Sequence, residues 1–174
     1  MKAAFSIMAL CFAAACGGAG GSGGSIDSGV DAPSSMVVQS VNAVRSSSDR
    51  TFAGMLNSVR AVNGSEPVFV DTHLVAAAQG HAEYIFNLGY LTHYNTDDAD
   101  LYDPGDRAIA AGYGSRFVGE NIGSGYLDEE SVLVGWVESP GHQANNIDSR
   151  FEDFGLAKAG TGSNQYWVLM LGRD

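Results

Sequence analysis

Apolar residues recur at helical spacing from residue 51 onward. Residues 51–62 carry one apolar stripe, and residues 72–88 carry a second. The second stripe repeats every three or four positions: Leu74, Ala78, His81 and Ile85. Asp71 stands where a helix N-cap is expected, and Gly89 stands where a helix usually ends. The pattern therefore predicts two amphipathic helices, with His81 on the buried side of the second.

The C-terminal half is expected to hold shorter helices, a turn and two strands. The helices are expected at residues 107–111 and 129–137, the turn at 119–123, and the strands at 154–159 and 165–171. Ser139 and Pro140 predict the start of a further short helix, with serine as the cap and proline in the first turn. The last strand is apolar on both faces, as in a central strand. Helices first and strands last favour an α+β fold with helices packed on a small antiparallel sheet.

The N-terminal part follows no such pattern. Residues 1–15 combine an early lysine, an apolar stretch and small residues at the end, as in a secretory signal peptide. Residues 16–48 begin with a glycine-rich run that has little to bury, so we expect a flexible Gly/Ser-rich tether. Only residues 36–44 carry scattered valines, which fit either a short helix or a strand packed on the domain. The folded domain is then expected over residues 49–174.

The end of the signal segment resembles a bacterial lipobox. Residues 13–17 read Ala-Ala-Ala-Cys-Gly, and cleavage before the cysteine leaves Cys16 free to carry lipid. This resemblance implies that Cys16 is the lipid attachment site of an exported protein, which is anchored in the bacterial cell envelope and has the membrane as a partner. The alternative is an ordinary cleaved signal in which Cys16 has no role.

Composition and charge exclude several classes of protein. The 174 residues include 9 Lys and Arg against 20 Asp and Glu, a net charge of −11, which argues against binding nucleic acid. Both cysteines precede residue 17, so no disulfide framework is expected in the folded domain. No long apolar run follows residue 16, which excludes a polytopic membrane protein. Five aspartates in residues 97–106 lack the pattern of a calcium-binding loop, so a solvated acidic loop is expected, with weak cation binding as the alternative.

The chain has only four histidines, which narrows the search for candidate chemistry. We expect His73 to be solvated and His81 to be a buried histidine with a hydrogen-bond partner. His93 and His142 instead lie in short polar segments next to predicted helices, and Glu120 lies in the predicted turn between glycines. These three residues are therefore the candidates for a functional site.

Together the motifs resemble the CAP superfamily, the group of cysteine-rich secretory proteins, venom antigens and plant pathogenesis-related proteins, and in particular its bacterial branch. They follow in the family's order: Gly-Glu-Asn-Ile at residues 119–122, a helix ending in Trp136, Ser-Pro-Gly-His at 139–142, and Tyr-Trp-Val at 166–168. The match spans residues 52–172. It implies a three-layer α–β–α sandwich with a central cleft.

The resemblance also implies a set of cleft residues. The family's cleft holds two histidines and two glutamates, and His93, Glu120 and His142 match three of these positions. Many members carry the fourth in a Trp-x-x-Glu motif, but Ser139 stands three residues after Trp136 here, and Glu138 stands only two after it. One position turns a helical side chain by about 100°, so Glu138 is a cleft candidate whose direction is open.

Imidazole nitrogens together with carboxylates suit zinc, whereas calcium prefers oxygen ligands, so a divalent cation held by His93 and His142 would be zinc rather than calcium. The same groups can serve general acid–base chemistry, or they can simply fix the loops. We expect a binding module for a cation or for a small extracellular or cell-wall ligand. The alternative is a hydrolase of peptide or cell-wall substrates that uses the same cleft. No catalytic residue is assigned, and Pro140 lacks the backbone N–H that a nucleophile at Ser139 requires.

Overall fold

The computed structural model describes residues 34–174 of the chain. Its elements, in chain order, are α1 (Ser35–Ser46), α2 (Phe52–Val62), β1 (Phe69–Val70), α3 (Thr72–Leu88), the 3-10 turn η1 (Ala99–Leu101), α4 (Pro104–Ala110), β2 (Val118–Ser124), α5 (Glu129–Glu138), α6 (Pro140–Ile147), β3 (Asp153–Thr161) and β4 (Asn164–Gly172). The predicted signal peptide, the lipid attachment at Cys16 and the first half of the predicted tether lie outside the described residues. Within residues 34–174, no helix is long and apolar enough to cross a membrane.

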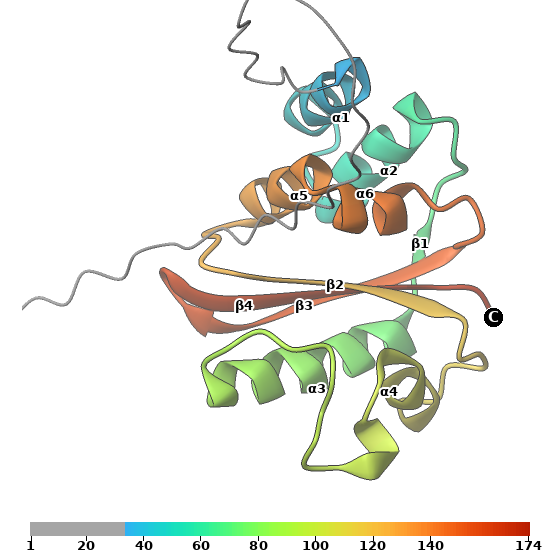
Figure 1. The fold of residues 1–174 in the computed structure, drawn as a ribbon. Coiled ribbons are helices and arrows are strands. Elements are labelled where there is room, and N and C mark those ends of the chain that lie inside the picture. The colour runs from blue at the N-terminus through green and yellow to red at the C-terminus, as the bar shows by residue number, and fades with distance from the viewer. Residues whose placement is uncertain (1–33) are drawn as a thin grey trace, which may run out of the picture. The chain divides into compact units, whose positions relative to one another are not determined.

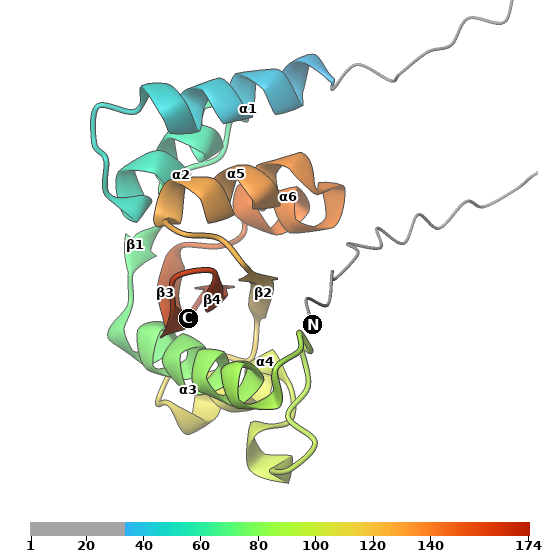
Figure 2. The same ribbon diagram turned by 90° about the vertical axis from the view of Figure 1, so that its left-hand side faces the viewer.

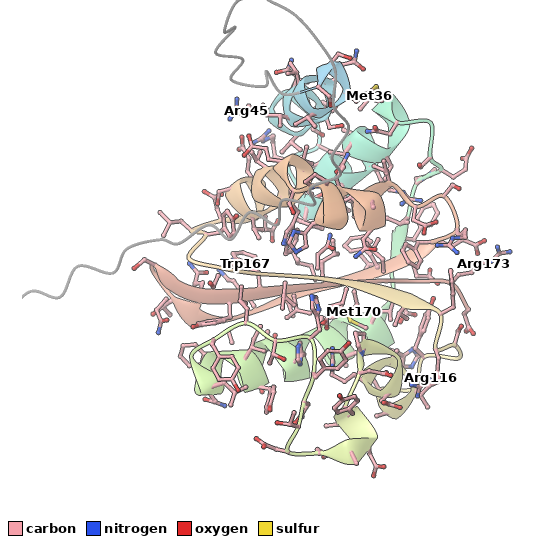
Figure 3. All side chains as sticks on the ribbon, in the orientation of Figure 1. Met36, Arg45, Arg116, Trp167, Met170 and Arg173 are labelled. Carbon is pink, nitrogen blue, oxygen red and sulfur yellow. The ribbon has the colours of Figure 1, made fainter. Side chains whose placement is uncertain are left out.

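The four strands form one sheet in the order β1-β3-β4-β2. β4 pairs antiparallel with both β3 and β2, which confirms it as a central strand. β1 pairs parallel with β3 over two residues only, so the sheet is mixed at that edge rather than wholly antiparallel. Alternate β4 side chains enter two separate cores, with Trp167 on one face and Met170 on the other (Figure 3).

Helices cover both faces of this sheet. α3 and α4 pack on one face, whereas α2, α5 and α6 pack on the other, with α1 stacked on α2 and α5 (Figure 1). The view turned by 90° shows the same separation (Figure 2). The three-layer α–β–α sandwich implied by the family resemblance is confirmed.

Local capping chemistry sets the ends of the main helices. Thr51 accepts a hydrogen bond from the backbone N–H of Gly54 at the start of α2, and Asp71 does the same for two amides at the start of α3. Gly89 ends α3 in the left-handed region, with φ of 75°, which glycine adopts without steric cost. The bounds of α3 agree with the predicted residues 72–88.

The helix α1 lies within the stretch predicted as a tether. Its Val41 and Val44 are buried in the same core as Phe52 of α2, so this segment has apolar surface to bury. The folded region therefore begins before residue 49, and of the two alternatives for residues 36–44 the structure contains the helix.

The predicted turn at residues 119–123 is wrong, because these residues belong to the edge strand β2. Gly119 lies under the ring of Phe151, where a Cβ would come within 2.9 Å of a ring carbon, and Gly123 lies close to Tyr126. Glycine at these positions admits the aromatic side chains of Phe151, which follows α6, and Tyr126, which precedes α5. The strand therefore lacks the apolar alternation that predicts strands, because glycines and Asn121 stand on the face where apolar residues are expected.

Candidate functional site

Glu120 is the centre of a buried polar cluster beneath β2. Its side chain is 1% exposed and points toward α3 and α4. Oε2 lies 2.6 Å from a terminal guanidinium nitrogen of Arg107 on α4, and Oε1 lies 2.8 Å from Nδ1 of His93 in the loop after α3. Nε2 of His81 on α3 is 3.8 Å from the same Oε1. Both carboxylate oxygens are thus occupied by protein groups.

These contacts fix the hydrogen positions on His93. Arg107 supplies the counter-charge that a buried carboxylate requires, and a carboxylate can only accept hydrogen bonds. Nδ1 of His93 therefore donates to Glu120, and Nε2 is the ring nitrogen that this contact leaves available. The His93 side chain is 45% exposed, so it is the face of the cluster that solvent and ligands can reach.

His142 comes from the opposite layer, in the first turn of α6. Its Nδ1 lies 2.8 Å from Oγ of Ser139, and its backbone oxygen accepts a hydrogen bond from Asn121 of β2. Burial, and to a smaller extent the nearby charge of His93, lowers the pKa of His142, so the ring is neutral at neutral pH. Beside it is a pocket of about 230 Å³, whose lining includes Leu91 and Trp136.

Glu138 does not join this arrangement. It is exposed at the end of α5 and lines a different hollow together with Arg45 and Glu130. Trp136 and Val137 take the buried positions of that turn, so the next side chain along the helix points to solvent. The structure thus brings His93 and Glu120 into contact and places His142 against Ser139, whereas Glu138 lines a different hollow.

Three residues of the site carry roles that sequence reasoning missed. Arg107 was expected only as part of a short helix, yet it neutralises Glu120; a lone arginine beside four consecutive apolar residues is the available signal. Ser139 was expected as a helix cap, but its side chain makes no capping bond and contacts His142 instead. His81 is buried and bonded to the backbone oxygen of Thr92, as expected, and it also faces Glu120.

The donor set is a poor match for a resident zinc ion. Structural sites use four protein ligands and catalytic sites use three. His93 and His142 each retain one ring nitrogen, but Glu120 is committed to His93 and Arg107, and the neighbour of His142 is a hydroxyl. Among residues 34–174, no three His, Cys, Asp or Glu side chains come together in a way that could hold a metal.

The acidic residues 97–106 serve local structure. Asp98 caps the turn η1, while Asp103 and Asp106 form a reciprocal capping box at the start of α4. Asp103 and Asp106 also pair with Arg116. A cation is therefore not needed to hold this loop.

The family assignment follows from comparison with known proteins. The sequence profile of CAP, described as the cysteine-rich secretory protein family, matches residues 53–171. The chain belongs to this family. Two Bacillus subtilis relatives of the CAP chain are the uncharacterized protein YkwD, 26% identical over 109 residues, and the uncharacterized membrane protein YlbC, 24% identical over 113 residues. These alignments cover 63% and 65% of the CAP chain but only 41% and 32% of the relatives.

Solved structures support the CAP fold. An extracellular protein with an SCP domain from Bacillus anthracis matches 72% of this chain and 40% of its own, with a TM-score of 0.63 and 22% identity. An outer surface protein from Borrelia burgdorferi matches 68% of this chain and 86% of its own, with a TM-score of 0.60 and 19% identity. At these identities the likeness shows the fold alone.

Proposed function

We propose that this CAP domain is an extracytoplasmic binding module that holds a small uncharged ligand, a fragment of cell-wall glycan or peptide, between His93 and His142 without turning it over. The observation that carries this proposal is the double engagement of Glu120, with His93 on one carboxylate oxygen and Arg107 on the other. A carboxylate held in this way positions an imidazole, and it is not free to act as a base.

The charge balance of the cleft supports an uncharged ligand. The negative charge of Glu120 is compensated by Arg107, and the lowered pKa keeps His142 neutral at neutral pH. What the cleft offers is a set of hydrogen-bonding groups: Nε2 of His93, the free ring nitrogen of His142 and Oγ of Ser139. Beside them is the apolar wall of the pocket at Leu91 and Trp136. Such a mixture suits a ligand with polar groups on a partly apolar body.

Two routes to turnover each lack a group in this cleft. A metal-bound water would need a third protein ligand, and among residues 34–174 none is available next to His93 and His142. A nucleophile at Ser139 would need an oxyanion donor from the next residue, which is Pro140. A hydrolase that uses this cleft would have to cleave one of the probes named for the binding experiment.

The proposal places the domain outside the cytoplasm, anchored by lipid at Cys16. It is supported by the lipobox-like sequence and by the solved relatives that are described as extracellular or outer surface proteins. Replacing Cys16 by serine should release the protein from the membrane fraction into the soluble fraction of an expressing bacterium. Retention of Cys16→Ser on membranes would count against the anchor.

The ligand is tested with two uncharged probes, di-N-acetylchitobiose and an acetylated, amidated dialanine. We expect one of them to bind the wild-type domain in calorimetry, and His142→Ala to lose that binding. Glu138→Gln, a change at the neighbouring exposed residue, should bind as the wild type does. Mass spectrometry of the same mixtures should detect no cleaved probe. Cleavage by the wild type that disappears in His142→Ala would establish the hydrolase instead.

A further inference from the structure

Two pockets lie at opposite ends of β2, the strand at one edge of the sheet (Figure 2). The first, here called the cleft pocket, is the pocket of about 230 Å³ beside His142, and Ile122 forms part of its wall. The second, here called the outer pocket, has a volume of about 390 Å³ and includes Val118 in its wall. A strand rises by about 3.3 Å per residue, so the four steps from Val118 to Ile122 span about 13 Å. The two pockets are therefore spaced along β2.

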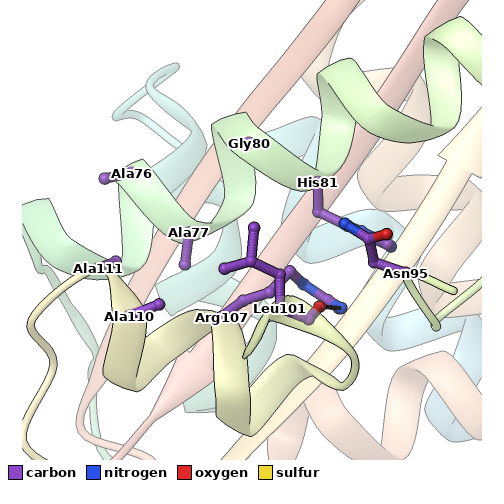
Figure 4. A pocket seen from close by; sticks show the side chains of 9 residues that line it. All are labelled: Ala76, Ala77, Gly80, His81, Asn95, Leu101, Arg107, Ala110 and Ala111. Atoms are coloured by element: carbon purple, nitrogen blue, oxygen red, sulfur yellow. Dashed lines mark hydrogen bonds between the residues drawn. The ribbon is translucent and has the colours of Figure 1, made fainter. Parts of the chain in front are cut away.

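The loop after α3 lines the same two pockets in the same order. Leu91 belongs to the cleft pocket, and Tyr94 belongs to the outer pocket. Between them, Nδ1 of His93 lies 2.8 Å from Glu120, which stands midway along this part of β2. The half-exposed ring of His93 thus lies between the two pockets. None of the described residues that line the pocket between α3 and α4 (Figure 4) belongs to β2 or to residues 91–94, so that pocket is separate from this row.

The outer pocket combines an aromatic ring with a charged pair. Tyr94 is 50% exposed, and its ring is stacked on Tyr102 with the ring centroids 5.1 Å apart, so packing holds the ring in place while much of it stays open. Arg116 and Asp103 also line the pocket, and Nη2 of Arg116 donates to Asp103 at 3.0 Å. The hydrogen bonds from Arg116 to its aspartate partners come from its terminal nitrogens, so they do not use Nε.

The cleft pocket offers the same combination of surfaces. Tyr126 and Trp136 supply aromatic surface there, and Ser139 and His142 supply hydrogen-bonding atoms. A sugar ring matches this combination, because it has a flat apolar face for an aromatic ring and a rim of hydroxyls that both donate and accept hydrogen bonds. Since the combination occurs at both ends of the row, it suits a ligand that repeats the same unit.

We infer that an uncharged oligosaccharide lies along β2, with one sugar in the cleft pocket beside His142 and another against Tyr94 in the outer pocket. This inference rests on the proposed function, because it assigns the glycan, and not the peptide, as the ligand of the same cleft. The charge of Arg116 is already balanced by Asp103 and Asp106, so the outer pocket has no spare positive charge for an anionic ligand.

The length of the sugar chain tests the inference. Calorimetry on the wild-type protein compares di-N-acetylchitobiose with tetra-N-acetylchitotetraose, which repeats the same sugar. We expect the tetrasaccharide to bind at least about fivefold more tightly, the order of one additional aromatic contact. Equal affinities, or no binding of either sugar, would overturn the inference. If neither sugar binds while the acetylated, amidated dialanine does, the proposed binding function survives and the glycan assignment fails.

Variants at Tyr94 locate the second sugar. Tyr94→Ala should fold, because the bonds of residue 94 to Thr92 use its backbone, and it should bind the tetrasaccharide at least about fivefold more weakly than the wild type does. Tyr94→Phe keeps the ring and should recover most of that affinity. Tyr90→Ala removes an equally large side chain that is 58% exposed and lines neither pocket, so it should bind as the wild type does. Wild-type affinity of Tyr94→Ala for the tetrasaccharide would overturn the inference.

Discussion

Oγ of Ser139 lies 2.8 Å from Nδ1 of His142, so the partner of this imidazole is a hydroxyl and not a carboxylate. Many members of the family carry glutamate at this point, three residues after the tryptophan that matches Trp136. The serine contributes neither negative charge nor a strong metal ligand. His93 and His142 match the two cleft histidines that the family resemblance implies, and the side chain beside His142 in this chain is a hydroxyl.

Restoring the carboxylate should restore metal affinity. We expect Ser139→Glu to bind zinc at least about tenfold more tightly than the wild type, because it adds a charged ligand beside His93 and His142. Calorimetry with zinc measures this directly, and Glu138→Gln is the control at the adjacent exposed position. Equal affinities of Ser139→Glu and the wild type would show that the missing carboxylate is not what limits metal binding.

Removal of Arg107 from its ion pair with Glu120 should strongly lower the stability of the fold. Arg107→Met leaves a buried carboxylate without its counter-charge, so the free energy of unfolding should fall by about 3–5 kcal/mol in urea denaturation. In the double variant Arg107→Met/Glu120→Gln no charge remains buried, and part of the loss should be recovered. A double variant that is less stable than Arg107→Met would contradict this.

Stability should decrease in mild acid because of buried histidines. Burial lowers the pKa of His81 and of His142 below the value of 6.5 expected in the unfolded chain. As the pH falls below 6.5, the unfolded chain takes up protons before the folded one does, so the free energy of unfolding falls until the lowered folded pKa is passed. At pH values well above 6.5 these two histidines are uncharged in both the folded and the unfolded chain. They then contribute nothing to the dependence of the free energy of unfolding on pH.

Urea denaturation at about pH 7.5, 6.5 and 5.5 measures this slope. His142→Gln should show a shallower decline than the wild type, because it removes one of the two groups. Asp106 and Asp148, whose pKa values are lowered by their arginine partners Arg116 and Arg150, lose their contribution only near and below their usual value of 3.8. A wild-type stability that stays level or rises as the solution is acidified over this range would exclude the buried neutral histidines.

Two glycines should respond to alanine in opposite directions. A Cβ at Gly155 of β3 would collide with the backbone of Leu74 and Val75, where α3 lies directly on the sheet, so Gly155→Ala should lose at least about 1–3 kcal/mol. Gly80→Ala meets open space inside the same helix and should gain about 0.5–1 kcal/mol. Thermal unfolding of both variants is the measurement. A loss in Gly80→Ala would contradict the open space at that position.

The elements that sequence predicted well are those defined by neighbouring residues. Asp71, Gly89 and the stripe between them determine α3 locally, and the alternation of residues 165–171 determines the central strand. The edge strand β2 was missed because it is stabilised by pairing with β4 and by the aromatic rings that lie on its glycines. Neither interaction can be inferred from the apolar pattern of neighbouring residues.

The site shows the same division between local and distant information. The family resemblance selected His93, Glu120 and His142, and the structure brings the first two into contact. The pairing of Arg107 with Glu120 joins α4 to β2 and depends on how α3 and α4 pack on the sheet. No local sequence motif therefore predicts it. The direction of Glu138 was open in the sequence because one helical position decides it, and the burial of Trp136 and Val137 settles the register.

The most direct test of the binding module is the ring-nitrogen NMR spectrum of His93 and His142 during titration with di-N-acetylchitobiose and with the acetylated, amidated dialanine. For one of the two probes, we expect the resonances of both rings to shift together and saturate at one equivalent, while the probe's own signals show no cleavage over the same period. Ring resonances that stay unchanged with both probes, or signals of cleaved probe that grow with time, would contradict ligand binding without turnover in this cleft.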